Sequence, residues 1–272
     1  MRKPTRSFHR LRRLRLRAAF TLTETVIAIG VLAVVLTGFI AVFTPAAQGI
    51  RRSISSEQAD RLTTTLENEL ATLRTGQSPA TATTAFDKGF TWLLEGGSSD
   101  YKKAIFVYQY RGNPADIRND GTPNPLPIIS GEPGKDYIVQ SMSRRLDDAK
   151  LEDDLKAIEG SVFFVKPTQL IYKPDPDDKN TPPKIILGLG DPGKIKNPEP
   201  LPVRVPPFPA EPTNANDYSE AVIAFSAEFH SVPTKTFAYL NGSTAFGKRF
   251  SDIVKLNSTV KPIFTRNLAV RR

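Results

Sequence analysis

The chain of 272 residues contains no cysteine and only two histidines, and both shortages exclude chemistry. Without cysteine it can form no disulfide, no thiol nucleophile and no cysteine-based metal site. His9 lies in a basic N-terminal segment, and His230 ends an apolar strand-like run, where a single histidine is usually packed or at an edge. No G-x-S-x-G or H-E-x-x-H pattern places catalytic groups side by side. We therefore expect this protein not to be an enzyme.

Acidic residues are missing from the first 23 positions, although the chain as a whole holds 28 of them. The formal net charge is +9, and almost all of that excess lies in residues 1–19, which hold Arg2, Lys3, Arg6, Arg10, Arg12, Arg13, Arg15 and Arg17. From Phe20 onward, 29 basic residues balance the 28 acidic ones. A folded nucleic-acid-binding domain carries its positive charge on its own surface, so no nucleic-acid partner is expected. The basic segment instead predicts a cytoplasmic N-terminus, with everything after Phe43 across the membrane.

An uncharged apolar run follows the basic segment. The 19 residues from Thr25 to Phe43 carry no charge. As an α-helix they span roughly 28 Å, close to the thickness of a bilayer's hydrocarbon core. One carboxylate, Glu24, stands immediately before the run. A carboxylate in a membrane segment is costly unless it has a partner, and no basic side chain follows Glu24 within one helical turn.

The junction Ala19-Phe20-Thr21-Leu22-Thr23-Glu24 resembles the processing site of type IV prepilins and of the pseudopilins of type II secretion. The resemblance covers about residues 10–75. Two positions depart from the family: Ala19 stands where Gly is normal, and Thr23 stands where Ile or Val is frequent. In layout, a long Pro-rich domain behind such an N-terminus is similar to the cassette-encoded pseudopilin-like proteins of verrucomicrobial type.

The resemblance implies a processing reaction and an assembly role. Prepilin peptidase would cut between Ala19 and Phe20, and Phe20 would become the N-methylated first residue. Glu24 would then pair with the N-terminal amine of an adjacent subunit and set the stagger of a filament. The implied partners are the peptidase, other pilin or pseudopilin subunits and the inner membrane, which the chain would cross once. Its C-terminal domain would be periplasmic, or extracellular once assembled, and its size favours a minor, tip or initiating subunit.

Other interpretations of the N-terminus stay open. Thr44-Pro45-Ala46-Ala47 offers small residues for signal peptidase, although the apolar run exceeds the usual signal core. An uncleaved signal anchor is the other alternative, and Glu24 could then sit at the headgroup level without a protein partner. In both cases the protein would be an exported binding module, membrane-anchored or secreted, that does not polymerise.

The patterns divide the chain into four segments. These are a basic leader at 1–19, the transmembrane half of a helix at 20–44, its amphipathic half at 45–75, and an exported domain at 76–272. Pro45 and Gly49 predict a kink that interrupts the helix. Apolar residues then resume at helical spacing, at Ile50, Ile54, Ala59, Leu62, Leu66, Leu70 and Leu73. Gly76 is the expected C-terminal stop.

The fold class predicted for the exported domain is α+β, with the long kinked helix packed on a mostly antiparallel sheet. Runs rich in β-branched and aromatic residues predict strands at 90–94, 104–110, 137–140, 161–165, 169–172, 184–187, 221–230 and 236–240. One short amphipathic helix is expected at about 144–158. Its acids Glu152, Asp153 and Asp154 are expected on the polar face.

Two Pro-rich stretches, 113–134 and 174–212, are expected to be loops or extended segments, since Pro cannot donate to a sheet. The second contains a G-x-G-x-x-G match at 188–193, but residues 194–198 cannot sustain the helix that a dinucleotide site needs, so we interpret it as a turn. We expect no cofactor other than calcium, for which Asp175, Asp177 and Asp178 are the candidate ligands. A solvated acidic turn is the preferred interpretation of that cluster.

Overall fold

The computed structural model describes residues 21–272 except 78, 128–130, 176, 181–183, 199–210, 243 and 256–257. The predicted leader and the two processing residues, Ala19 and Phe20, lie outside the described residues. The chain forms two compact units, Met1–Arg51 and Arg52–Arg272. The first holds the apolar half of the N-terminal helix, and the second holds the rest of that helix and the globular domain.

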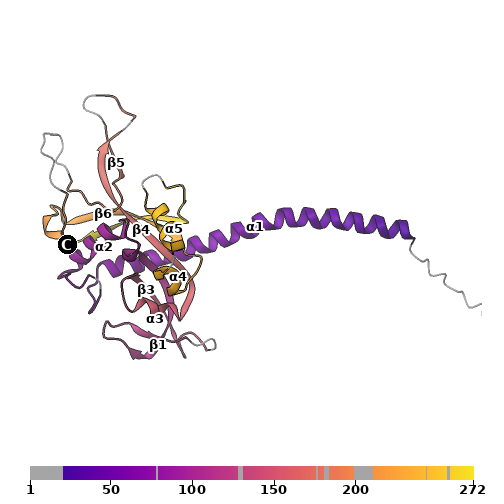
Figure 1. Cartoon of the computed structure of the whole chain (residues 1–272), viewed down its shortest axis with the longest axis horizontal. Coiled ribbons are helices and arrows are strands. Elements are labelled where there is room, and N and C mark those ends of the chain that lie inside the picture. Colours follow the sequence, from indigo (N-terminus) through magenta and orange to yellow (C-terminus); the bar gives the residue numbers. More distant parts are fainter. Residues whose placement is uncertain are drawn as a thin grey trace, which may run out of the picture. The chain divides into compact units, whose positions relative to one another are not determined.

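The N-terminal helix α1 runs from Leu22 to Leu70 without a break (Figure 1). Pro45 and Gly49 both lie inside it, so the predicted interruption at these residues is wrong. A proline removes one backbone hydrogen bond, and the helix formers on both sides carry the helix past it. The helix also ends five residues before the predicted limit at 75. Gly76 adopts a left-handed φ of 71°, as a stop residue would, but it lies in the turn beyond the helix.

The described residues of the domain form a seven-stranded sheet whose strand pairings are all antiparallel, so the predicted α+β class is confirmed. Its strands are β1 (Ile105–Ile117), β2 (Pro123–Pro125), β3 (Ile138–Arg145), β4 (Ile158–Pro174), β5 (Ile185–Leu189), β6 (Val222–Ser231) and β7 (Phe264–Arg271). The main path runs β2-β1-β4-β6-β7, with β3 paired to β1 and β5 paired to β4.

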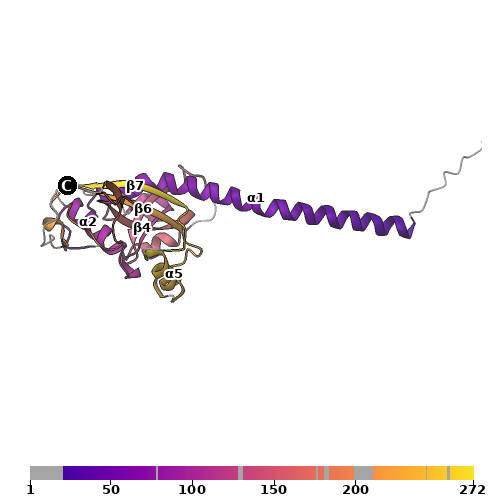
Figure 2. The ribbon, with the colours of Figure 1, turned by 90° about the horizontal axis from the view of Figure 1, so that it is seen from above.

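Helices cover both faces of the sheet. Because side chains alternate along a strand, Ile105 and Val107 of β1 face one core while Phe106 and Tyr108 face the other. The first core is completed by the part of α1 beyond Arg52 and by α2 (Ala85–Gly96). The second is completed by α3 (Leu151–Leu155), α4 (Phe237–Gly242) and α5 (Thr244–Val254). Figure 2 shows α1 and α5 on opposite sides of the sheet.

The predicted apolar stripe of α1 is confirmed where it meets the sheet. Ala59, Leu62, Leu66 and Leu70 are all buried in the first core, while Ile50, Ile54 and Leu73 remain exposed. The stripe therefore packs on the domain only through its middle, and its two ends contribute no core side chain.

Several predicted elements are wrong in type. Residues 90–94 lie in α2, where Thr84 and Asp87 form a capping box that starts a helix. Residues 236–240 likewise contribute to α4. Of the helix expected at 144–158, only Leu151–Leu155 is helical. The predicted start is wrong because Arg144 and Arg145 are the last two residues of strand β3. The separate strands at 161–165 and 169–172 are one strand, β4.

The Pro-rich stretches are only partly loops. β1 continues to Ile117, and Pro123–Pro125 pairs with it as β2, so the loop prediction for 113–134 is wrong at these residues. Prolines are tolerated there because a short edge strand does not need every N–H. Inside 174–212, the strand predicted at 184–187 is confirmed as β5. Residues 190–198 contain no helix, so the turn interpretation of the glycine motif is confirmed.

Candidate functional site

The first turn of α1 holds the candidate assembly residue, Glu24. Thr21 and Glu24 form a reciprocal cap: the Glu24 N–H donates to Thr21 Oγ1 at 3.2 Å, and Thr21 N and Oγ1 donate to Glu24 Oε2 at 2.9 and 3.0 Å. This is the T-x-x-E capping box, which satisfies backbone donors that a helix start otherwise leaves unpaired. Sequence reasoning missed this role of Thr21, although the spacing of three to a glutamate signals it. Both bonds that Glu24 accepts within the described residues use Oε2.

The helix that follows carries a long exposed apolar surface. Residues Leu22–Ala47 form a helix long and apolar enough to cross a membrane, and its most apolar stretch of 18 residues contains no buried residue. The large exposed side chains are Leu22, Val26, Ile27, Ile29, Val31, Leu32, Val34, Val35, Leu36, Phe39, Ile40, Val42 and Phe43. A contiguous apolar surface of this extent marks a segment that lipid or other helices must cover.

The calcium candidates do not assemble into a metal site. No group of three or more potential ligand residues gathers in the described part of the chain, which includes Asp175, Asp177 and Asp178. Asp178 accepts instead from the backbone N–H groups of Asn180 and Lys184 at 3.0 and 2.9 Å. These bonds lower the pKa of Asp178 and hold the turn before β5. The solvated acidic turn is the better description of this cluster.

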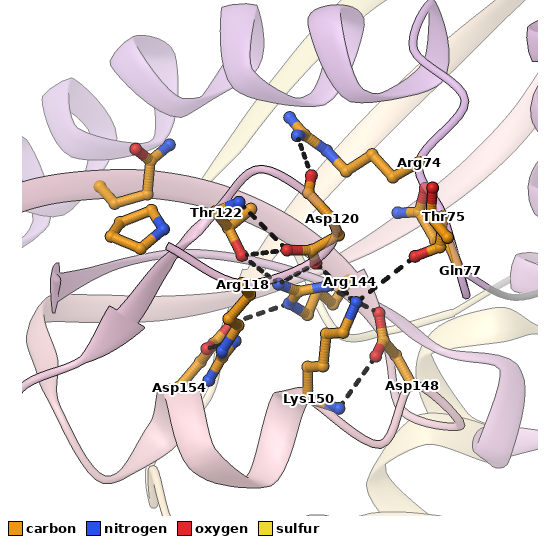
Figure 3. A network of polar contacts seen from close by, with 12 residues as sticks. Arg74, Thr75, Gln77, Arg118, Asp120, Thr122, Arg144, Asp148, Lys150 and Asp154 are labelled. Carbon is orange, nitrogen blue, oxygen red and sulfur yellow. Dashed lines mark hydrogen bonds and ion pairs between the residues drawn. The ribbon is translucent and has the colours of Figure 1, made fainter. Parts of the chain in front are cut away.

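A buried ion network surrounds Arg144 at the end of β3 (Figure 3). Its guanidinium contacts three carboxylates: Asp120 at 3.1 Å, Asp148 at 3.0 Å and Asp154 at 2.7 Å. All four side chains are 3% exposed or less. Two cations at the rim balance the remaining charge, since Arg118 contacts Asp154 at 2.6 Å and Lys150 contacts Asp120 at 2.9 Å.

The network corrects the prediction for Asp154 and explains the short helix α3. Glu152 and Asp153 are exposed as predicted, but Asp154 is fully buried, where it also accepts from the Tyr108 hydroxyl at 2.7 Å. Burial and the neighbouring charge of Asp154 raise the pKa of Tyr108 well above its usual value, so this hydroxyl stays a donor. The cluster ties together β1, β3, α3 and the turn around Asp120. Its charges are matched and removed from water, as in a structural network.

A second buried network closes the end of α1. Lys88 of α2 is fully buried and donates to the backbone carbonyls of Glu69 and Thr72, near the C-terminus of α1. Its ammonium also lies 3.1 Å from Glu69 Oε1 and 3.1 Å from Gln77 Oε1. Burial lowers the pKa of Lys88, and the charge of Glu69 opposes that shift. A lysine from another helix thus binds carbonyls at the end of α1, where donors within the helix run out.

Arg74 connects the two networks. Its Nε contacts Glu69 Oε2 at 3.0 Å, and its Nη1 donates to the backbone carbonyl of Asp120 at 3.2 Å. Lys150, which also belongs to the Arg144 network, contacts the turn that follows α1, where its Nζ lies 3.5 Å from the carbonyl of Thr75. The end of α1 is therefore fixed by charged side chains from α2 and from the Arg144 network. Sequence reasoning missed this arrangement because its partners are far apart along the chain.

His230 takes the packed role expected from sequence. It is 2% exposed on β6, and its ring stacks on Phe164 with centroids 5.9 Å apart. Its Nε2 lies 3.6 Å from Glu228 Oε2. Glu228 in turn contacts Lys166 at 3.2 Å on the neighbouring strand β4.

No protein-family model, curated protein or solved structure matches the chain.

Proposed function

We propose that this chain is a prepilin-like structural subunit, a minor pilin or pseudopilin. Prepilin peptidase would remove residues 1–19, and α1 would hold the product in the inner membrane. From there it would assemble with other pilin-like subunits into a type IV pilus or a type II secretion pseudopilus. The observation that carries the proposal is the first half of α1: an exposed apolar helix long enough to cross a membrane, with one carboxylate in its first turn.

Charge distribution supports an assembly role for Glu24. The sequence has no Lys or Arg between Phe20 and Ile50, so Glu24 has no cationic side chain on its own membrane segment. After removal of the leader, the nearest available cation is the new amine of Phe20, in the same chain or in a neighbour. The capping box uses Oε2, and Oε1 points to no bond within the described residues. An amine from a neighbouring helix can therefore bind Glu24 without breaking the cap.

The basic leader supports the proposed topology. Eight positive charges precede α1, and the positive-inside rule keeps such a segment in the cytoplasm. The globular unit, which begins beyond Arg51, would then lie in the periplasm, or outside the cell once a filament forms. Absence of cysteine is compatible with that compartment, because the domain's two cores are closed by apolar packing and buried ion networks.

Three variants distinguish the helix cap formed by Thr21 and Glu24 from the negative charge of Glu24. Glu24→Gln keeps a side chain that can cap the helix but removes the negative charge. Thr21→Ala removes the hydroxyl of the cap but keeps the charge. Glu57→Ala removes an exposed carboxylate whose ion pair with Arg61 lies further along the same helix, as a matched control. The measurement is co-purification of the chain with pilin-like subunits from detergent-solubilised membranes, together with its fraction in the membrane pellet.

The proposal expects that Glu24→Gln abolishes co-purification, while Thr21→Ala and Glu57→Ala retain it. Membrane insertion should be unchanged in all three, because loss of a carboxylate makes a membrane helix less costly to insert. Retention of the partners by Glu24→Gln would contradict the assembly role. A chain that inserts but never captures such subunits would instead be a membrane-anchored binding module.

A further inference from the structure

The far half of β4 and all of β5 form a two-stranded arm. Residues 170–174 of β4 pair with residues 185–189 of β5, while the earlier part of β4 pairs with β6 in the main sheet. Figure 1 shows β5 extending away from the other strands of the domain. We call these two paired segments the β4–β5 arm. A two-stranded ribbon is marginally stable by itself, so further strands along its edge would stabilise it.

One face of the arm is apolar and exposed. In the register of the two strands, Leu170 opposes Leu189 and Tyr172 opposes Leu187, so these four side chains share a face. Tyr172 is 73% exposed, Leu187 51% and Leu189 41%. Exposure of this kind on neighbouring residues marks a surface that another molecule covers.

Among the described residues, none pairs with the outer edge of β5, and β4 is its one partner strand. The Gly190 N–H donates to the Gln169 carbonyl, and the Asp175 N–H donates to the Lys184 carbonyl. The backbone N–H and C=O groups of the even-numbered residues of β5 therefore point toward β4. By alternation, Ile185, Leu187 and Leu189 direct their backbone groups away from β4. Only the Leu189 carbonyl has a recorded side-chain donor, the exposed Lys173 Nζ at 3.3 Å.

This edge lacks the usual protection. Natural edge strands are blunted by charged side chains, proline or a bulge. The strand Ile185-Ile186-Leu187-Gly188-Leu189 carries no charge and no proline, and its pairing with β4 is regular. Charges stand at its two ends instead, with Lys184 before it and Asp191 after it. This distribution is self-complementary when two copies of the strand run in opposite directions.

We propose that the outer edge of β5 pairs antiparallel with the same edge of a second copy of this chain, about a two-fold axis at Leu187. Leu187 then opposes Leu187 of the other copy, and Ile185 opposes Leu189. The two apolar faces join into one four-stranded ribbon. Lys184 of each copy opposes Gly190 of the other, one residue from its Asp191, whereas parallel pairing would align Lys184 with Lys184.

The pairing is independent of the helix-mediated assembly proposed above. Its contacts lie wholly on the arm, and it joins two copies whether or not α1 is part of a filament. Asp191 currently contacts Lys196 at 3.2 Å, with both side chains more than 40% exposed. Such an exposed pair is weak, so Asp191 can exchange this partner for Lys184 of the second copy.

Cysteine cross-linking tests the pairing in the full chain in membranes. Because the natural sequence has no cysteine, every disulfide must involve an introduced residue. Leu187→Cys places the two Cα atoms about 5.5 Å apart across the axis, within the range that a disulfide bridges. Copper phenanthroline should therefore convert Leu187→Cys to a covalent homodimer. Tyr172→Cys is the control: it is more exposed and on the same face, but its two copies lie about 14 Å apart, across three strand spacings.

Charge reversal tests the register. In the Leu187→Cys background, Lys184→Glu should lower the dimer yield, because it brings a second negative charge close to Asp191 of the other copy, and Lys184→Glu with Asp191→Lys should restore it. Glu24→Gln in the same background should leave the dimer intact, which separates this proposal from filament assembly. Equal yields from Leu187→Cys and Tyr172→Cys would overturn the proposal. So would absence of a dimer, or a disulfide from Leu187→Cys to a different protein.

Discussion

Removal of Arg144 should destabilise the domain more than any loss of a surface charge. Arg144 is 1% exposed and contacts Asp120, Asp148 and Asp154. In Arg144→Met three buried carboxylates keep only the rim cations Arg118 and Lys150. Removing one partner from a buried ion pair typically costs 3–5 kcal/mol, so we expect a loss of about 3–5 kcal/mol. That is a large part of the roughly 5–15 kcal/mol that stabilises a typical domain.

The chain carries its own reporter for this experiment. Trp92 is the only tryptophan and is fully buried in the first core, so its fluorescence follows unfolding of the domain without a contribution from the membrane helix. With a slope of about 2–3 kcal/mol per molar urea, the midpoint of Arg144→Met should fall by about 1–2 M. The control is Lys156→Met, which removes the exposed Lys156–Asp153 pair and should cost about 1 kcal/mol or less. Equal midpoints for the two variants would refute the structural role of the network.

Three further outcomes follow from the contacts of the domain. Lys88→Met should cost about 3 kcal/mol, measured by urea unfolding, because the buried Glu69 loses its buried cation and keeps only the partly exposed Arg74, and adding Glu69→Gln should recover part of that loss. Burial raises the pKa of Asp120, but bonds from Thr122 and Lys150 and the charge of Arg144 outweigh it and hold that pKa well below its usual value. Stability should therefore fall as the pH drops below about 4, and Thr122→Val should shrink this fall in acid titrations read by fluorescence. Gly89→Ala should destabilise by about 1–3 kcal/mol, because the new Cβ would lie 2.6 Å from Val270 Cγ1, and Val270→Ala should offset part of it in a double-mutant cycle.

The elements that sequence predicts well are those with a strong local signal. The strand predicted at 221–230 matches β6, and that at 104–110 lies largely within β1, because β-branched and aromatic residues run continuously where both faces of a sheet are covered. The buried stripe of α1 follows directly from helical spacing. Residues 90–94 fail because Phe and Trp favour a strand locally, while the capping box at Thr84 and Asp87 begins a helix upstream of them. β7 lies at a sheet edge, and its only buried residues are Leu268 and Val270, so it carries a weak local strand signal.

The residues of the candidate site also fall into two groups: those that a local sequence pattern predicts, and those that only the fold brings together. Glu24 was found from sequence because a single carboxylate beside an uncharged run is unusual whatever the fold. Its cap by Thr21 is a local pattern that sequence could have revealed. The Arg144 network has no local signature, because Asp120 lies 24 residues from Arg144 and only the pairing of β1 with β3 brings that region together. Lys88 is similar, because its partner Glu69 is 19 residues away.

The N-terminal residue of the protein from native membranes tests the central claim most directly, and mass spectrometry identifies it. The proposed function predicts a chain that begins at N-methylated Phe20, with Ala19 and the leader removed. A chain that keeps the leader would contradict prepilin processing and leave a single-pass anchor. A chain that begins near Ala47 would contradict it as well and show that α1 is cut by signal peptidase.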